Sequence, residues 1–413
     1  MKIKFHHVLA FFLLTLFFDF DYELSFVRLR IMDFYLVILV ILMILSGGYF
    51  KIKNNAATIS FYLFIVFILL NGIAKVTLGS VIKETIQLLE YVFIMHLIAN
   101  ATNETQKRKE FLDVLFWGTG CIAFFSMIYS ASRGHYANFK DLDAPKHSFA
   151  FFALLAVMRL FTSSGSGKKT IFQLAAIFLA LMMLLLSGER KGWAAFIIGT
   201  GIFTYLQSKS RFSKKTINAM VTFIVIAAAV GTIAALYLSG QPQFRYINRQ
   251  FSSLSDITNV FSGGGSAYES KSDEERIFML HYGIQLFTKF PISGIGVDQF
   301  RIYVYKATSG EFGHDAHNFY LKVLVEDGII GILLYLTPLF LIFIELWKLA
   351  KSRIPDIARD GRIIIALFFL GSVVNLFLAG KALSWLYLIL PCGMLLGLNR
   401  ELVFRKSINE IRQ

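Results

Sequence analysis

Residues 328–347, GIIGILLYLTPLFLIFIELW, form an unbroken apolar run in which Glu345 is the single charged residue. A helix that crosses a bilayer needs about 20 predominantly apolar residues, because the hydrocarbon core is roughly 30 Å thick. The run therefore predicts a transmembrane helix. Directly before it, residues 313–327 read GHDAHNFYLKVLVED and place two histidines at the mouth of that helix.

Similar apolar runs recur along the whole chain. Of its 413 residues, 56% are hydrophobic and 16% are charged, whereas about 25% of the residues in a soluble protein are charged. The predicted fold is therefore all-α: a polytopic membrane protein with about 12 transmembrane helices. The candidate spans are centred near residues 14, 40, 64, 90, 120, 155, 178, 199, 228, 338, 370 and 390.

The first span has features of a signal peptide. Lys2 and Lys4 precede an apolar stretch, but the bulky and charged residues 19–30 that follow offer no small-residue cleavage site. We expect an uncleaved first membrane helix.

The short connections between the spans indicate their orientation. Connections such as residues 49–55 (YFKIKNN), 103–110 (NETQKRKE) and 207–215 (QSKSRFSKK) are rich in Lys and Arg, whereas 74–79 (AKVTLG) is poor in them. Because cytoplasmic loops collect positive charge, we expect both termini in the cytoplasm and an even number of spans. The formal charge of +14 belongs mainly to these connections, so no nucleic-acid partner is predicted.

One connection is much longer than the others and by parity faces the periplasm. It includes a flexible stretch, FSGGGSAYES, and a helical pattern at residues 275–290. Long ordered loops in compact proteins are usually functional. The expected organisation is residues 1–238 as transmembrane helices 1–9, residues 239–326 as a large, partly helical periplasmic loop domain, and residues 327–413 as helices 10–12 with a cytoplasmic tail.

Two groups of cations are candidate anion ligands. Glu189, Arg190 and Lys191 lie in a tight outward-facing turn between two apolar runs, and Arg276 opens the helical pattern of the long loop. An ordinary charged turn and the polar start of an amphipathic helix would explain them. The alternative is a phosphate site, because Arg and Lys beside apolar walls bind phosphate strongly in a low dielectric.

His314 and His317 are three residues apart and could share a helix face. A zinc site would need a third and usually a fourth ligand, and no spacing connects His281 or Asp298 with this pair, so no metal is predicted. The histidines are either structural residues of the interface or candidates for a general base, because neutral imidazole accepts protons near neutral pH.

Polar residues also recur within the fourth predicted span. Lys83, Glu84, Gln87 and Glu90 are one, three or four residues apart, which places a polar stripe on one helix face. Ionisable groups in a membrane usually face a cavity or one another. We expect Lys83 and Glu90 to line a cavity, with a packed hydrogen-bonding network as the alternative.

The order of these motifs resembles the O-antigen ligase family and the related lipid-linked O-antigen polymerases. A Ser-Gly-x-Arg-x-Gly turn precedes the long loop, which carries an Arg-led helix, a Pro-x-x-Gly-x-Gly turn, and then His-Asn-x-Tyr-Leu and Glu-x-Gly-x-x-Gly leading into a helix. The matching residues are Ser187, Arg190, Gly192, Arg276, Pro291, Gly294, Gly296, His317, Asn318, Tyr320, Leu321, Glu326, Gly328 and Gly331.

The resemblance implies a membrane glycosyltransferase of lipopolysaccharide biosynthesis. Its donor is a glycan on undecaprenyl diphosphate, and its acceptor is a sugar hydroxyl of lipid A–core for a ligase or the next lipid-linked glycan for a polymerase. The family mechanism is inverting and uses no metal or other cofactor. The active site is expected to face the periplasm at a bacterial inner membrane, while the membrane lipids hold the lipid tail of the donor.

Residue roles also follow from the resemblance. Arg190 and Arg276 match positions that bind the diphosphate, and His317 matches the base that deprotonates the acceptor, with Asn318 and Glu326 as supporting residues. The chain differs from many relatives by having Glu189 and Lys191 beside Arg190, so Lys191 is a second candidate cation and Glu189 a supporting residue. His314 is a competing candidate for the base.

Other functions fit parts of the pattern. A single dominant outer loop favours a ligase over a polymerase. A 12-helix transporter would explain the spans and the polar stripe, but the long loop is not central and the two halves show no repeat. A scaffold of envelope assembly is the third alternative.

Overall fold

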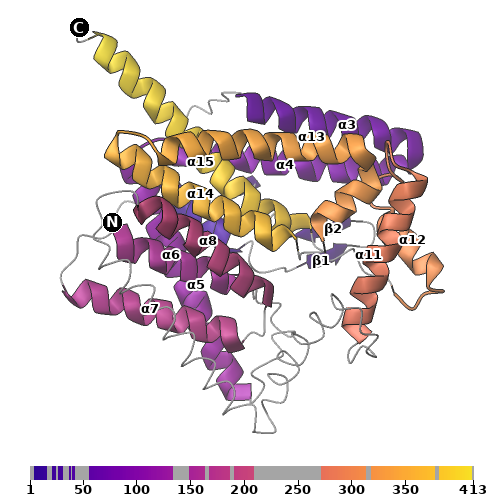
Figure 1. Cartoon of the computed structure of the whole chain (residues 1–413), viewed down its shortest axis with the longest axis horizontal. Helices are drawn as coiled ribbons and strands as arrows, with labels where there is room; N and C mark the ends of the chain where they lie inside the picture. Colours follow the sequence, from indigo (N-terminus) through magenta and orange to yellow (C-terminus); the bar gives the residue numbers. More distant parts are fainter. Residues whose placement is uncertain are drawn as a thin grey trace.

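The computed structural model describes residues 4–15, 21–24, 27–30, 37–38, 40–41, 55–133, 148–162, 167–186, 190–208, 271–312, 318–376 and 381–411. Helices dominate this part of the chain (Figure 1). They are α1 (Phe5–Thr15), α3 (Ala56–Lys75), α4 (Leu78–Ala101), α5 (Thr105–Arg133), α6 (Ser148–Thr162), α7 (Gly167–Leu186), α8 (Arg190–Ser208), α11 (Lys271–Lys289), α12 (Phe300–Ala307), α13 (Phe319–Ala350), α14 (Pro355–Asn375) and α15 (Lys381–Ile411).

The described part of the chain is mainly helical, as predicted, and adds one short antiparallel hairpin. The hairpin consists of β1 (Asp21–Leu24) and β2 (Val27–Arg30). The two segments, DYEL and VRLR, alternate charged with apolar residues, which is the period of a strand. The register pairs an acidic with a basic position twice, Asp21 with Arg30 and Glu23 with Arg28, and opposite charges at facing positions favour pairing.

Ten of the twelve predicted spans are centred within described helices. The centre near residue 228 lies outside the described residues, and around residue 40 only residues 37–38 and 40–41 are described. Within the described ranges, α3 and α13 are both long and apolar enough to cross a membrane, and α1, α6 and α7 contain shorter apolar segments. The membrane character is supported, whereas the number of about 12 spans stays a prediction.

The exposed face of α3 carries an apolar surface that suits contact with lipid. A row of large apolar side chains at alternating spacings of four and three residues is at least half exposed along this helix. Such a row lies on one helix face, and a contiguous apolar surface of this kind suits contact with lipid rather than water. The residues are Ile59, Leu63, Val66, Leu70 and Ile73.

Two hydrophobic cores hold the described helices. In the larger core α13 packs between α3 and α14, α14 packs against α8 and α15, and α15 packs against α4. The smaller core joins α11 and α12 to the first turns of α13, through Met279, Phe300 and Leu321 among others. Figure 1 shows α11 and α12 at one end of the long helices, and the marked chain ends at the opposite end.

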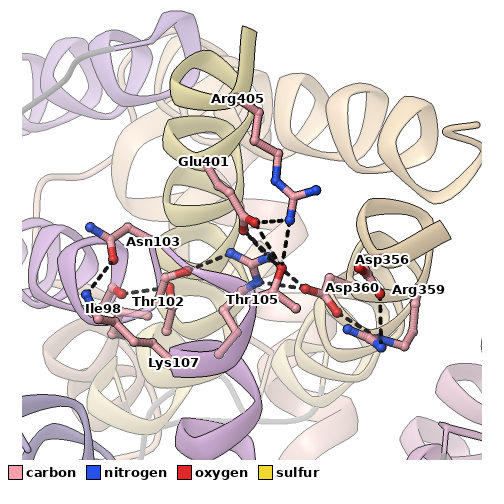
Figure 2. A network of polar contacts seen from close by, with 11 residues as sticks. Ile98, Thr102, Asn103, Thr105, Lys107, Asp356, Arg359, Asp360, Glu401 and Arg405 are labelled. Atoms are coloured by element: carbon pink, nitrogen blue, oxygen red, sulfur yellow. Dashed lines mark hydrogen bonds and ion pairs between the residues drawn. The ribbon is translucent and has the colours of Figure 1, made fainter. Parts of the chain in front are cut away.

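A buried ion-pair network ties three helices together near the start of α14. The guanidinium of Arg108, which is 1% exposed, donates to Asp360 at 2.9 Å, to Glu401 at 2.6 Å and to the carbonyl oxygen of Thr102 at 2.8 Å. Thr105 also donates to Glu401 at 2.9 Å (Figure 2). The network joins the turn between α4 and α5 to α14 and α15.

Candidate functional site

Two glycine-containing segments bind each other through their backbones. We call them together the glycine clasp: residues 291–296, which follow α11, and residues 325–330 of α13. Their four hydrogen bonds run from Ile295 N to Val325 O at 3.0 Å, Gly296 N to Glu326 O at 2.8 Å, Ile329 N to Pro291 O at 2.8 Å and Ile330 N to Ile292 O at 3.2 Å. The Pro-x-x-Gly-x-Gly and Glu-x-Gly-x-x-Gly motifs are therefore two halves of one structure.

The clasp contains three glycines with a left-handed backbone, and one of them, Gly296, has φ of +100°. Gly294 and Gly328 both have φ of +66°, a left-handed region that residues with a side chain rarely adopt. A Cβ atom on Gly294 would lie 2.3 Å from the backbone carbonyl of Glu326, and one on Gly328 would lie 2.4 Å from the carbonyl oxygen of Ile292. Gly328 also interrupts the helical backbone of α13, beside the predicted boundary between outer loop and span.

The end of α3 anchors the clasp to the helix bundle. Lys75 Nζ donates to the carbonyl oxygen of Ser293 at 2.6 Å and to that of Gly294 at 2.7 Å. Asn71 Nδ2 donates to the Ser293 carbonyl at 2.9 Å. These bonds satisfy carbonyl groups that the tight turn leaves without backbone partners. Residues 293–294 are thus fixed to the end of α3 by charged and polar contacts.

A small pocket lies between α3, α4 and α13 beside the clasp. Its apolar lining includes Phe64, Leu88 and Phe319, and its ionisable lining consists of Glu84, Lys322, Glu326 and Asp327. These four side chains are each at least 91% buried. Buried charges need partners, so the buried ionisable lining distinguishes this pocket from an ordinary apolar cavity.

Two of these side chains have defined partners at residue 298, between the clasp and α12, and at residue 300, where α12 begins. Lys322 Nζ lies 3.8 Å from Asp298 Oδ1, and Glu326 Oε1 accepts a hydrogen bond from Phe300 N at 3.1 Å. The latter satisfies an amide in the first turn of α12, where no intrahelical partner exists. The predicted supporting residue Glu326 therefore joins α12 to α13.

Lys322 and Asp327 were missed as site residues from the sequence. The available signal was spacing, because Lys322 and Glu326 are four residues apart and share a helix face. Their shared pocket with Glu84 could not be predicted from sequence spacing, since α4 is distant in sequence.

The structure places the polar residues of α4 differently from the prediction that Lys83 and Glu90 line a cavity. Lys83 is exposed and Glu90 is half-buried, while their neighbour Glu84 is the α4 carboxylate that lines the pocket. The helical rotation of about 100° per residue separates Lys83 from Glu84.

Asn318 caps the N-terminus of α13. Its side-chain oxygen accepts a hydrogen bond from Leu321 N at 3.0 Å, which satisfies one of the amides that a helix start leaves without a partner. The cap fixes the point at which the chain enters α13. His314 and His317 lie outside the described residues, directly before this cap.

Arg190 and Lys191 form the first turn of α8, and Glu189 lies outside the described residues. Helix α8 runs antiparallel to α14, because Arg362 near the start of α14 donates to Gln207 near the end of α8 at 2.7 Å. The first turn of α8 thus lies towards the C-terminal end of α14. At that same end, Tyr320 Oη donates to the Ser372 carbonyl at 3.1 Å, so the starts of α8 and α13 face one end of the bundle.

Arg276 lies on α11 with an exposed side chain. Helix α11 reaches α13 at Gly283, where a Cβ atom would lie 3.3 Å from the side chain of Leu321. Arg276 is seven residues before this contact, or about 10 Å along the helix. Helices α8 and α11 carry the predicted phosphate ligands, and α13 begins directly after the predicted base. The structure thus brings these three helices to the same end of α14.

The comparisons with known proteins cover the part of the chain that contains these segments. Residues 175–336 match the family model described as O-antigen ligase. An uncharacterized protein of Haemophilus influenzae is 28% identical over 236 residues, a match that covers 54% of this chain and 56% of that protein. The chain therefore spans just over half the length of this relative. The segment that resembles the O-antigen ligase family runs from within α7 to within α13 and so contains α8, α11 and α12.

Proposed function

We propose that the chain is a membrane glycosyltransferase that moves a glycan from undecaprenyl diphosphate to a sugar hydroxyl of lipid A–core. The observation that carries this proposal is that one family segment, residues 175–336, contains Arg190, Arg276, the clasp and His317. The fold supports the proposal because it gathers the helix starts that carry these residues.

Arg190, Arg276 and Lys191 bind the donor diphosphate in this proposal. Helix α8 has two cations and no acidic residue in its first turn. Cations there oppose the helix dipole, whose positive end attracts anions instead. A diphosphate at this end offsets that repulsion and accepts bonds from the backbone amides. The lipid tail then lies in the outer leaflet, with the diphosphate at the periplasmic interface of the inner membrane.

The reaction is a substitution at the anomeric carbon of the donor sugar. The acceptor hydroxyl oxygen attacks that carbon from the face opposite the diphosphate, the bond between carbon and diphosphate oxygen breaks, and the stereochemistry inverts. The hydroxyl proton passes to the imidazole of His317, with His314 as the competing base. Guanidinium groups stabilise the charge that develops on the leaving diphosphate, so the step needs no metal.

The clasp and the cap position these groups. Asn318 fixes the start of α13 directly after His317. Glu326 and the clasp fix α11 and α12 against α13. A base must be held close to the proton that it removes, and rigid elements on both sides of residues 313–317 serve that purpose.

A complementation experiment tests the proposal. The wild-type chain and His317→Ala are expressed in a strain that lacks its own copy, and the lipopolysaccharide is resolved on gels beside the lipid-linked fraction. Long glycans on lipid A–core that disappear with His317→Ala, at equal protein level, support a ligase with an essential histidine.

Two results would redirect the assignment. Lipid-linked chains that shorten to one repeat without the active protein identify a polymerase with the same donor. A glycan that is unaffected in both fractions, together with transport that survives His317→Ala, contradicts a transferase and favours the 12-helix transporter.

A further inference from the structure

Three metal-ligand side chains converge where α1 packs against α5, outside every family motif. His6 and His7 lie in the first turn of α1, and Glu110 lies in the second turn of α5. The Nε2 atoms of His6 and His7 lie 2.7 Å and 3.4 Å from the same Glu110 Oε2. Donor atoms of all three residues lie within 4.8 Å of one another.

We propose that His6, His7 and Glu110 form a binding site for one divalent transition-metal ion of the zinc class. Two imidazoles and one carboxylate are a ligand set that zinc accepts, with the remaining position open to water. Ligand atoms around a tetrahedral zinc ion lie roughly 3.3 Å apart, given bonds of about 2 Å. The separations from Glu110 are already near that value, so small side-chain movements complete the site.

The surroundings hold the ligands in place. His6 is 4% exposed, and its ring stands edge-on to that of His7 with centroids 4.4 Å apart. Gln106 Nε2 donates to Glu110 Oε1 at 2.8 Å, which orients the carboxylate with Oε2 near the two imidazole rings. Groups of this kind behind the direct ligands orient them and raise metal affinity. The ligands come from two helices, so a bound ion would cross-link α1 to α5.

Lys4 offers an alternative partner for the same carboxylate. Its Nζ lies 2.9 Å from Glu110 Oε2, and its side chain is 54% exposed. The cluster could therefore be an ordinary network of ion pairs. The two interpretations predict opposite effects of removing Lys4. An ion-pair network loses a partner, whereas a metal site loses a competing and repelling cation.

The site is remote from the proposed transferase centre. Glu110 follows the buried Arg108 in α5, and Arg108 bonds Asp360 near the start of α14. The clasp end of the bundle is marked by Ser372, about 18 Å further along α14. The ion would therefore stabilise the folded protein by binding it in preference to the unfolded chain, without taking part in transfer.

The test uses the full chain in detergent, purified through a tag without histidine. We expect one equivalent of Co²⁺ to bind and to give visible absorption. Zn²⁺ should displace the Co²⁺ and raise the unfolding temperature. The double variant His6→Ala/His7→Ala and the variant Glu110→Gln should lose the Co²⁺ signal. Lys4→Ala should bind Zn²⁺ at least several-fold more tightly, and His281→Ala, which removes an exposed histidine on α11, should match the wild type.

Several results would overturn the site. Equal Co²⁺ signals in the wild type and in Glu110→Gln would mean that the ion binds elsewhere, as would a signal lost in His281→Ala. Absence of Zn²⁺ binding by both the wild type and Lys4→Ala, together with a lower unfolding temperature of Lys4→Ala, would identify the cluster as an ion-pair network. This last variant retains all three ligands, so it decides the question even if the double variant does not fold.

Discussion

The amide nitrogen of Gly296 donates a 2.8 Å hydrogen bond to the carbonyl oxygen of Glu326, while the Glu326 carboxylate accepts from Phe300 N at 3.1 Å. One residue of α13 therefore holds residues 296–300 through both its backbone and its side chain. Two motifs of the family that are about thirty residues apart in sequence act as one structural unit.

The clasp predicts a strong effect of adding a single methyl group. Gly294→Ala and Gly328→Ala should each destabilise the protein by about 1–3 kcal/mol from the left-handed backbone alone, with more from the overlap with a carbonyl group. Thermal unfolding in detergent measures the loss. The matched control is Gly201→Ala in α8, where no atom lies within 4 Å of an added Cβ; it should be neutral or stabilising. Equal effects at all three positions would contradict the clasp.

The buried guanidinium of Arg108 predicts a second stability effect. Arg108→Ala leaves Asp360 and Glu401 buried without it, and removing one partner of a buried ion pair costs about 3–5 kcal/mol. Its neighbour Lys107 makes an exposed pair with Glu104, and such pairs contribute less than about 1 kcal/mol. The unfolding temperatures of Arg108→Ala and Lys107→Ala should therefore differ clearly, and similar values would argue against a buried network.

Lowering the pH should weaken the buried ion-pair network around Arg108. Burial raises the pKa of Glu401, but hydrogen bonds and charge from Arg108 outweigh it and hold the pKa below the ordinary value of 4.5. A lowered folded-state pKa stabilises the fold above the unfolded-state pKa, and this contribution is lost as the pH falls through the folded-state value. Unfolding temperatures from about pH 7 to about pH 3 should fall less steeply for Glu401→Gln than for the wild type. Parallel curves would exclude this role for Glu401.

The proposed diphosphate ligands predict loss of transfer without loss of protein. Arg190→Ala and Arg276→Ala should each reduce glycan transfer by about 100-fold or more, because each removes a donor that stabilises developing charge. Arg190→Lys and Arg276→Lys keep the charge but lose the bidentate geometry, so they should retain partial activity. Activity in membranes is compared with the amount of folded protein. Wild-type transfer by both alanine variants would contradict the proposed roles.

The cap at Asn318 predicts a separation of stability from side-chain chemistry. Asn318→Ala should cost about 1 kcal/mol, whereas Asn318→Asp retains an oxygen acceptor and the cap. If the cap positions His317, transfer should fall for the alanine variant and remain close to wild type for the aspartate variant. The reverse order would assign Asn318 a direct chemical role through its amide group.

Much of the candidate site could be predicted locally. The capping Asn318, the glycine motifs and the cations of α8 each depend on residues close in sequence, so their types and spacings indicate their roles. The hairpin of β1 and β2 shows that a local signal can also be outweighed. Its period-two alternation is visible in the sequence, but the hairpin lies in a short charged connection between two apolar runs that are both predicted to be membrane helices.

The sequence by itself determined the membrane character and the order of the apolar segments, because the transfer free energy of each run is a sum over neighbouring residues. Only the tertiary structure decided which segments meet. Glu84 lines a pocket with Lys322. Asn71 and Lys75 hold the turn at Ser293. His6 contacts Glu110. These contacts join helices far apart in the chain, and their partners are selected by packing of whole helix faces, which no local pattern records.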